Sequence, residues 1–153
     1  MLKRWDPMHA NNENPGVGKV FQIAVQRWFQ ETLNMPFELE KKIAIGYPAK
    51  LHSFDIASAD GNIVVECKCY TWTESGNVPS AKMGFANEAA FYLSFLPRKI
   101  DKSIIMLKAV HPKRNETLAE YYFRTNRHLL GDIKVCEFDP NTGTMSLIGQ
   151  NKF

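Results

Sequence analysis

The sequence predicts an α/β protein in which a mixed β-sheet is flanked by helices. Three segments repeat apolar residues at helical spacing, and six shorter segments alternate apolar and polar residues or are apolar throughout. Three consecutive strand segments precede a helix and a further strand, an order that combines an antiparallel meander with a helical crossover. The complete expected order is αβββαβαββ.

Composition places the chain among ordinary globular domains. It has 153 residues, of which 44% are hydrophobic and 23% charged. We treat residues 1–153 as a single domain, with an irregular segment over 1–16, a core over 18–110, and an added C-terminal helix and hairpin over 111–153. No apolar run approaches the ~18 residues of a membrane span, the polar N-terminus does not resemble a signal peptide, and three cysteines are too few for a disulfide framework. These features predict a cytoplasmic protein without membrane contact.

The first half of the chain predicts one helix and three strands. An amphipathic helix is expected from about 18 to 33, followed by an alternating strand over 37–45. Two further strands, about 53–59 and 62–72, flank Asp60-Gly61, a pair that favours a two-residue type I′ hairpin turn.

The second half predicts a crossover and a closing hairpin. After a loop over 73–78, a helix over about 79–96 is apolar around most of its circumference and should be covered on more than one side. The strand over 103–110 has the continuous apolar run of an interior strand. A third helix over about 116–130 ends at Gly131, and strands over 133–138 and 144–148 form the hairpin.

The predicted turn sets a register that brings three functional side chains together. With residues 60 and 61 in the turn, partner positions sum to 121, so Asp55 lies opposite Glu66 in a hydrogen-bonded pair with α-carbons ~5.5 Å apart. Lys68 shares their face because side chains alternate along a strand. The opposite face is expected to pack against the core and carries Phe54, Ile56, Ile63, Val65, Cys67 and Cys69.

Two facing carboxylates predict a cation site. Their repulsion is relieved if one protonates or if a cation lies between them, and carboxylate oxygens suit Mg²⁺, which fills its remaining positions with water and phosphate oxygens. The backbone carbonyl of Cys67 is a candidate further ligand. Lys68 would hold or deprotonate a water and offset the charge of a transferring phosphate.

These residues resemble the motif of a known superfamily. Phe54-Asp55, ten intervening residues and then Glu66-Cys67-Lys68 are similar to the PD-(D/E)xK nuclease signature, with Phe54 in place of its proline. The predicted αβββαβ order over 18–110 resembles the restriction-endonuclease-like core. The resemblance implies an endonuclease or exonuclease in which Asp55 and Glu66 bind one or two Mg²⁺ ions, with Mn²⁺ as a substitute. It also implies that Lys68 assists the nucleophilic water, and it favours DNA over RNA as substrate.

The resemblance also suggests accessory residues. Gln22 stands where members often carry a glutamate on the first helix, and Lys82 and Asn87 lie near the start of the crossover helix. Trp72, beside the loop that leaves the catalytic strand, is a candidate contact to nucleic acid. Arg98 and Lys99 begin a basic stretch that either follows a phosphate backbone or forms a solvated face. Cutting both strands would require a homodimer or a partner subunit, since the chain has little room for a second domain.

Other interpretations stay open at this stage. Asp55, Glu66 and Lys68 could form a solvent-facing ladder without a ligand, and the chain could be a catalytically inactive nuclease-like module that binds nucleic acid or a protein. Hydrolysis of a small-molecule or RNA phosphoester is a third alternative. Cys67 and Cys69 are expected to be small buried thiols rather than zinc ligands, and His52 to lie in an exposed turn.

Overall fold

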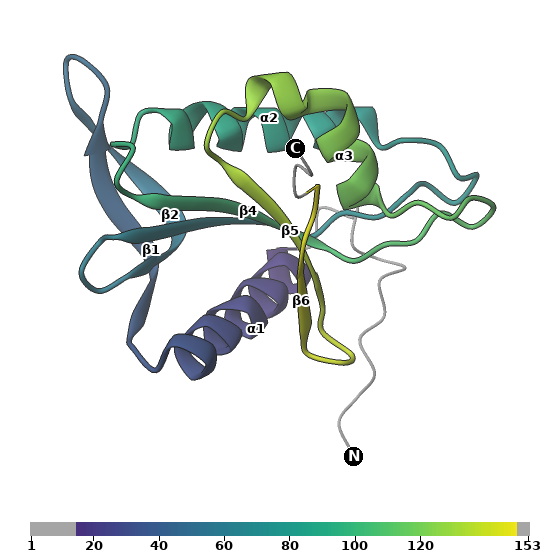
Figure 1. Cartoon of the computed structure of the whole chain (residues 1–153), viewed down its shortest axis with the longest axis horizontal. Coiled ribbons are helices and arrows are strands. Elements are labelled where there is room, and N and C mark those ends of the chain that lie inside the picture. The colour runs from purple at the N-terminus through teal and green to yellow at the C-terminus, as the bar shows by residue number, and fades with distance from the viewer. Residues whose placement is uncertain (1–14, 150–153) are drawn as a thin grey trace.

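The computed structural model describes residues 15–149, which form a six-stranded mixed sheet with helices on both faces (Figure 1). Helix α1 lies on one face, and α2 and α3 lie on the other. The helices are α1 (Pro15–Leu33), α2 (Ser80–Ser94), α3 (Leu118–Asn126) and the short 3₁₀ helix η2 (Arg127–Leu129). The strands are β1 (Phe37–Ile45), β2 (Lys50–Ser58), β3 (Ile63–Lys68), β4 (Asp101–Leu107), β5 (Lys134–Asp139) and β6 (Thr144–Leu147).

The strands lie side by side in chain order, β1-β2-β3-β4-β5-β6. Pairs β3–β4 and β4–β5 are parallel, whereas β1–β2, β2–β3 and β5–β6 are antiparallel. Each parallel step needs a crossover, which α2 and α3 supply on the same face. The expected α/β class, element order and mixed sheet are therefore confirmed.

Two separate cores pack the two faces. Phe21 and Val25 of α1 meet Val65 and Ile105 on one side of the sheet. On the other side, buried side chains of α2 and α3 meet the alternate residues of the central strands, such as Ile104. Strand β4 is buried from its second residue onward, as its apolar run predicted.

Several element boundaries differ from the prediction. Helix α1 begins at Pro15, so the expected irregular segment ends before residue 15, and its first fourteen residues lie outside the described range. Proline suits this first turn because its missing N–H has no helical partner there. Strand β3 ends at Lys68, not near Trp72, and α3 begins at Leu118 behind Thr117, whose side chain accepts the Glu120 N–H.

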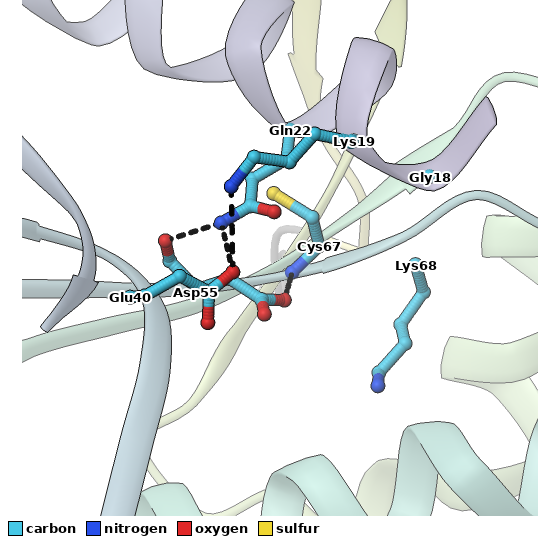
Figure 2. A pocket seen from close by; sticks show the side chains of 7 residues that line it. All are labelled: Gly18, Lys19, Gln22, Glu40, Asp55, Cys67 and Lys68. Carbon is cyan, nitrogen blue, oxygen red and sulfur yellow. Dashed lines mark hydrogen bonds and ion pairs between the residues drawn. The ribbon is translucent and has the colours of Figure 1, made fainter. Parts of the chain in front are cut away.

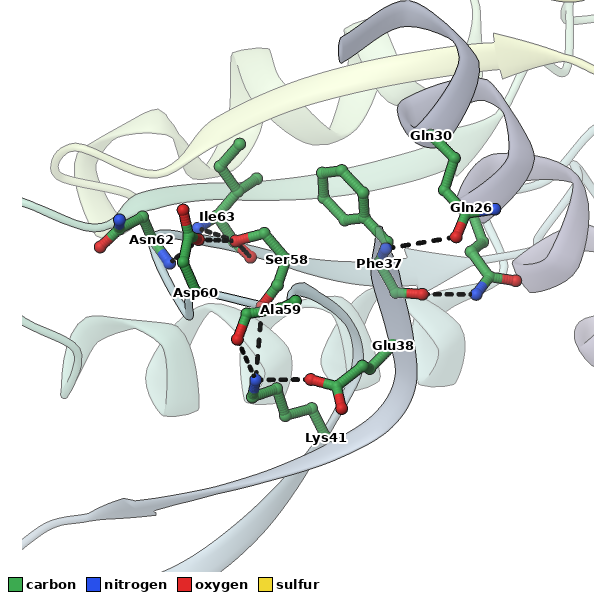
Figure 3. Close-up of polar contacts among 10 residues, drawn as sticks. All are labelled: Gln26, Gln30, Phe37, Glu38, Lys41, Ser58, Ala59, Asp60, Asn62 and Ile63. Atoms are coloured by element: carbon green, nitrogen blue, oxygen red, sulfur yellow. Dashed lines mark hydrogen bonds and ion pairs between the residues drawn. The ribbon is translucent and has the colours of Figure 1, made fainter. Parts of the chain in front are cut away.

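The β2–β3 turn differs in kind from the prediction but keeps its register. Residues 59–62 connect the strands, and the Gly61 N–H donates to the Ser58 carbonyl at 2.9 Å. The Ser58 hydroxyl donates to the Asp60 carboxylate at 2.6 Å within the same loop (Figure 3). A type I′ turn needs positive φ at both central residues, but Gly61 has φ of 77° and Asp60 is not in that region. The observed pairs Ile56–Val65 and Ala57–Val64 still sum to 121, because the longer loop has the same centre.

Strands β1 and β2 reverse the faces that they present midway along their length. Leu39 packs against the α1-side core and Ile43 against the α2-side core, although unbroken alternation would place them together. In β2, Ile56 likewise packs against the α1-side core and Phe54 against the α2-side core. The change in β1 occurs at Glu40, whose φ of 51° lies in the left-handed region. The expectation that Phe54 shares a face with Ile56 is therefore wrong, because the ribbon turns over between them.

Glutamines on α1 anchor the start of β1. The Gln26 side chain donates to the Phe37 carbonyl at 2.7 Å, and the Phe37 N–H donates to the Gln30 side chain at 3.2 Å (Figure 3). These bonds set the position of α1 against the edge of the sheet. Within residues 15–149, no helix is both long and apolar enough to cross a membrane.

Candidate active site

The site lies where β2 and β3 separate. Their ladder ends at the pair Ile56–Val65, and beyond it the Asp55 carboxylate accepts the backbone N–H of Cys67 at 2.8 Å. The side chain of Asp55 thus takes the place that a strand carbonyl would fill, and holds its carboxylate at the gap between the two strands. The face reversal of β2 at this residue makes that position accessible to both sides of the sheet.

Glu66 meets Asp55 at this gap. Glu66 is only 6% exposed, and by strand alternation it shares the face of Val64, which packs in the core on the α2 side of the sheet. Burial, the charge of Asp55 and a hydrogen bond shared with Asp55 raise the pKa of Glu66 to about 9. Glu66 therefore favours its neutral form at neutral pH. Because Glu66 is buried, the solvent-facing ladder considered above is wrong.

Lys68 is a free amine beside this pair. It is half-buried and lines a cavity of about 320 Å³ that also contains Asp55. Figure 2 shows its ammonium extending away from Gln22 and Lys19, and no residue in the described part of the chain makes a hydrogen bond or close ion pair with it. An unpaired lysine beside an acidic pair is available to a ligand.

The cavity is lined by residues of helix α1 and of strands β1, β2 and β3. Its lining residues are Gly18, Lys19, Gln22, Glu40, Asp55, Cys67 and Lys68 (Figure 2). The predicted residues Asp55, Gln22, Cys67 and Lys68 are thus brought together, with Glu66 buried against Asp55. Lys19 and Glu40 were not predicted.

Glu40 had a signal in the sequence that we did not use. A hairpin with residues 46–49 as its loop pairs positions that sum to 95, and Glu40 and Asp55 do lie between the pairs Leu39–Ile56 and Lys41–Phe54. The left-handed backbone of Glu40 costs a non-glycine residue ~1–3 kcal/mol, and such strain is concentrated at functional sites.

His52 also belongs to the neighbourhood of the site. It lies in β2, not in an exposed turn, and its ring stacks on Tyr92 with centroids 3.9 Å apart. Its Nε2 is 3.9 Å from Glu66 Oε1. Burial lowers the pKa of His52, the charges of Asp55 and Glu88 opposing this effect, so the ring is mainly neutral at pH 7.

The donor set fits Mg²⁺. No three side chains of His, Cys, Asp or Glu within residues 15–149 are grouped so that they could hold a metal ion. Mg²⁺ requires fewer, because it binds through one or two carboxylates and keeps several waters. Asp55 and Glu66 supply two hard carboxyl groups, which meets this requirement.

Cys67 can contribute only its backbone. Burial and the charges of Asp55 and Glu66 raise the pKa of its thiol far above the usual range, so no thiolate is present for a soft metal. Cys69 is buried with its thiol pKa raised to about 12 by burial, as the sequence predicted for a structural thiol.

No protein-family model, curated protein or solved structure matches this chain. The superfamily resemblance therefore stays a prediction. The geometry of the acidic pair, the free amine and the cavity is what supports a function.

Two predicted accessory residues lie apart from the cavity. Asn87 joins α2 to α3, since its amide donates to Asn126 at 3.0 Å and accepts the Tyr122 hydroxyl at 3.0 Å. Lys82 lies over the rings of Tyr70 and Phe85, 5.6 Å from each centroid. Neither residue lines the cavity.

The predicted nucleic-acid contacts also lie elsewhere. Trp72 is 5% exposed and donates its indole N–H to the Ala109 carbonyl at 2.9 Å, so it is a core residue and has no free ring face. Arg98 and Lys99 precede β4, which starts beside Ile63 at the amino end of β3. The site is at the carboxyl end of β3, so these two residues lie at the opposite end of the parallel strands.

Asn87→Ala should lower stability without changing the site. Loss of two partly buried hydrogen bonds is expected to reduce the free energy of unfolding by ~1–3 kcal/mol, because Tyr122 and Asn126 lose their partner. Denaturant unfolding measures this change. The affinity of the variant for Mn²⁺, measured by calorimetry, should equal that of the unmodified protein. A loss of Mn²⁺ affinity without a loss of stability would show that Asn87 contributes to the site.

Proposed function

We propose that the protein hydrolyses phosphodiester bonds of nucleic acid, DNA in preference to RNA, with Mg²⁺ or Mn²⁺ held by Asp55 and Glu66. The observation that supports this proposal is the Asp55–Glu66 carboxyl pair at the gap between β2 and β3, beside Lys68, which lines an open cavity together with Asp55. The proposal includes the finer fold assignment, a restriction-endonuclease-like core over residues 18–110.

Each residue has a role that its position allows. The Asp55 and Glu66 carboxylates, with the Cys67 carbonyl, would hold the ion, which when bound polarises the scissile phosphate and its attacking water. The Lys68 ammonium would orient that water and offset negative charge as the phosphate is attacked. The hydrogen bond from the Cys67 N–H keeps the Asp55 carboxylate at the gap between the strands.

The α1 wall supplies positive charge on the other side of the cavity. Lys19 lies in the first two turns of α1, where the helix dipole favours anions, and its side chain is 47% exposed. The only ion pair found for it in the described part of the chain is with Glu40, at 3.8 Å. Lys19 is therefore available to a substrate phosphate on the α1 side of the cavity, whereas the Lys68 ammonium extends away from it (Figure 2).

The direct test is cleavage with and without a divalent ion. Purified protein incubated with supercoiled plasmid and with single-stranded DNA should cut in Mg²⁺ or Mn²⁺ and not in excess EDTA, and Glu66→Ala should not cut. The described residues form one such site, so nicked circles should precede linear product unless two copies or a partner act together. Binding of DNA without cleavage under every metal condition would instead support the inactive binding module.

A further inference from the structure

Two acceptors fix which way the Gln22 amide faces, the Glu40 carboxylate and the backbone carbonyl of Asp55. The Gln22 side chain is 6% exposed, and its Nε2 donates to Glu40 Oε1 at 2.9 Å and to the Asp55 backbone carbonyl at 2.6 Å. A carboxylate and a carbonyl only accept hydrogen bonds, so both amide hydrogens of Gln22 must face them. The amide carbonyl oxygen must then face the other way, and Figure 2 shows it directed toward Cys67 and the cavity.

The carbonyl oxygen of the Gln22 amide, Oε1, accepts no hydrogen bond from any donor in the described part of the chain, although the rest of the side chain is buried. A buried amide with a free oxygen at the wall of a cavity, next to the main chain of Asp55, is a ready donor of a neutral hard oxygen. With only two carboxylates at the proposed ion, neutral oxygens must complete its surroundings.

Glu40 is itself held as an acceptor. Its second carboxylate oxygen accepts the Ser53 hydroxyl at 3.1 Å, and the Lys19 ammonium is 3.8 Å from the first. Its left-handed backbone occurs at the step where β1 reverses its faces, which places the carboxylate at the α1 wall. Each of these contacts comes from a hydrogen-bond donor, so the Glu40 carboxylate is positioned as an acceptor for Gln22.

We propose that Glu40 is a positioning residue, which orients the Gln22 amide so that its carbonyl oxygen serves the divalent ion or an ion-bound water beside Asp55. This inference rests on the proposed function, because it requires the ion. In this inference the α1 side of the site contributes a neutral ligand, the Gln22 carbonyl oxygen, and Glu40 on β1 orients it.

The test is Mn²⁺ binding by calorimetry on the full chain, without substrate. Glu40→Ala and Gln22→Ala should each weaken Mn²⁺ binding by about 10-fold, the lower end of the effect usual for groups that orient metal ligands. The double variant should bind only as weakly as either single variant, because both remove the same oxygen.

A conservative variant separates positioning from direct binding. Glu40→Gln can still accept from the Gln22 amide and should bind Mn²⁺ within about 3-fold of the unmodified protein, since only the amide contact matters. If the Glu40 charge held the ion directly, Glu40→Gln would lose as much affinity as Glu40→Ala. Ser53→Ala is the matched control, because it removes a contact of Glu40 but leaves the Gln22 amide in place.

The outcomes distinguish this inference from the proposed function. Absence of Mn²⁺ binding by the unmodified, folded protein overturns the proposed function and this inference with it. Normal Mn²⁺ binding that is insensitive to Glu40→Ala, or additive losses in the double variant, overturn only the inference. Circular dichroism of each variant confirms that the comparison is between folded proteins.

Discussion

Asp55→Asn should abolish divalent-ion binding and reduce DNA cleavage by about 1,000-fold, because an amide cannot supply the charge that the ion requires. An ion at the reacting phosphate contributes several kcal/mol to the transition state, and ~1.4 kcal/mol corresponds to a tenfold rate change. The asparagine oxygen can still accept the Cys67 N–H, which the Asp55 carboxylate accepts at 2.8 Å, so the strand gap should survive the change. Calorimetry with Mn²⁺ and initial rates of plasmid nicking measure the two effects.

The matched control for this variant is Asp101→Asn. Asp101 is the first residue of β4, at the other end of the parallel strands, where its carboxylate contacts Lys134 at 2.9 Å on the surface. Removing the same charge there should leave ion binding and nicking unchanged, since an exposed ion pair contributes ~1 kcal/mol or less. If Asp55→Asn nicked DNA at the normal rate, the acidic pair would have no catalytic role.

Lys68→Ala should retain Mn²⁺ binding and lose cleavage by about 100- to 1,000-fold. Its ammonium is not a metal ligand, so the ion keeps both carboxylates, but the water and the charged phosphate lose the group that orients and stabilises them. Removal of a neighbouring positive charge should, if anything, strengthen Mn²⁺ binding. Parallel calorimetry and single-turnover cleavage separate these two effects.

Lys134→Ala is the corresponding lysine control. It removes an ammonium from the exposed ion pair with Asp101, far along the strands from the cavity, and should cleave like the unmodified protein. If Lys68→Ala cleaved normally, lysine would be excluded from the mechanism. If it lost Mn²⁺ binding as well as cleavage, its role would be to maintain the fold of the site.

Much of the fold was predictable because its signals are local or nearly so. The central strand β4 is recognisable as a buried apolar run. The register of β2 against β3 followed from the centre of one short loop, which survived an error in turn type because both turns share that centre. These features depend on residues that are close in the chain, where the spacing of apolar residues directly reflects the geometry of a helix or strand.

The expectation that α2 is covered on more than one side is wrong, because the helix buries a single face and leaves Phe85, Phe91 and Phe95 exposed. The expected hydrogen-bonded ladder pair of Asp55 with Glu66 is not formed, because the ladder ends at Ile56–Val65 and the Asp55 side chain accepts the Cys67 N–H instead.

The errors concern contacts between distant segments. Trp72 was expected at the substrate and is buried against Ala109, and Asn87 was expected at the site and instead joins two helices. Arg98 and Lys99 were grouped with the site by their charge, but the parallel pairing of β3 with β4 places them at the far end of the sheet. Polar residue types alone do not specify which neighbours they meet.

From its order of residues alone, this chain determines an acid opposite an acid with a lysine two positions on, because strand geometry repeats every second residue. Only the tertiary structure decided that Glu66 is buried while Asp55 and Lys68 stay partly exposed, since the burial of Glu66 depends on elements that pack from elsewhere in the chain. It also decided that Gln22 and Glu40 face the same cavity, because α1 and β1 meet there through packing that no local pattern encodes. The raised pKa of Glu66 follows from that packing, as does the oriented amide of Gln22.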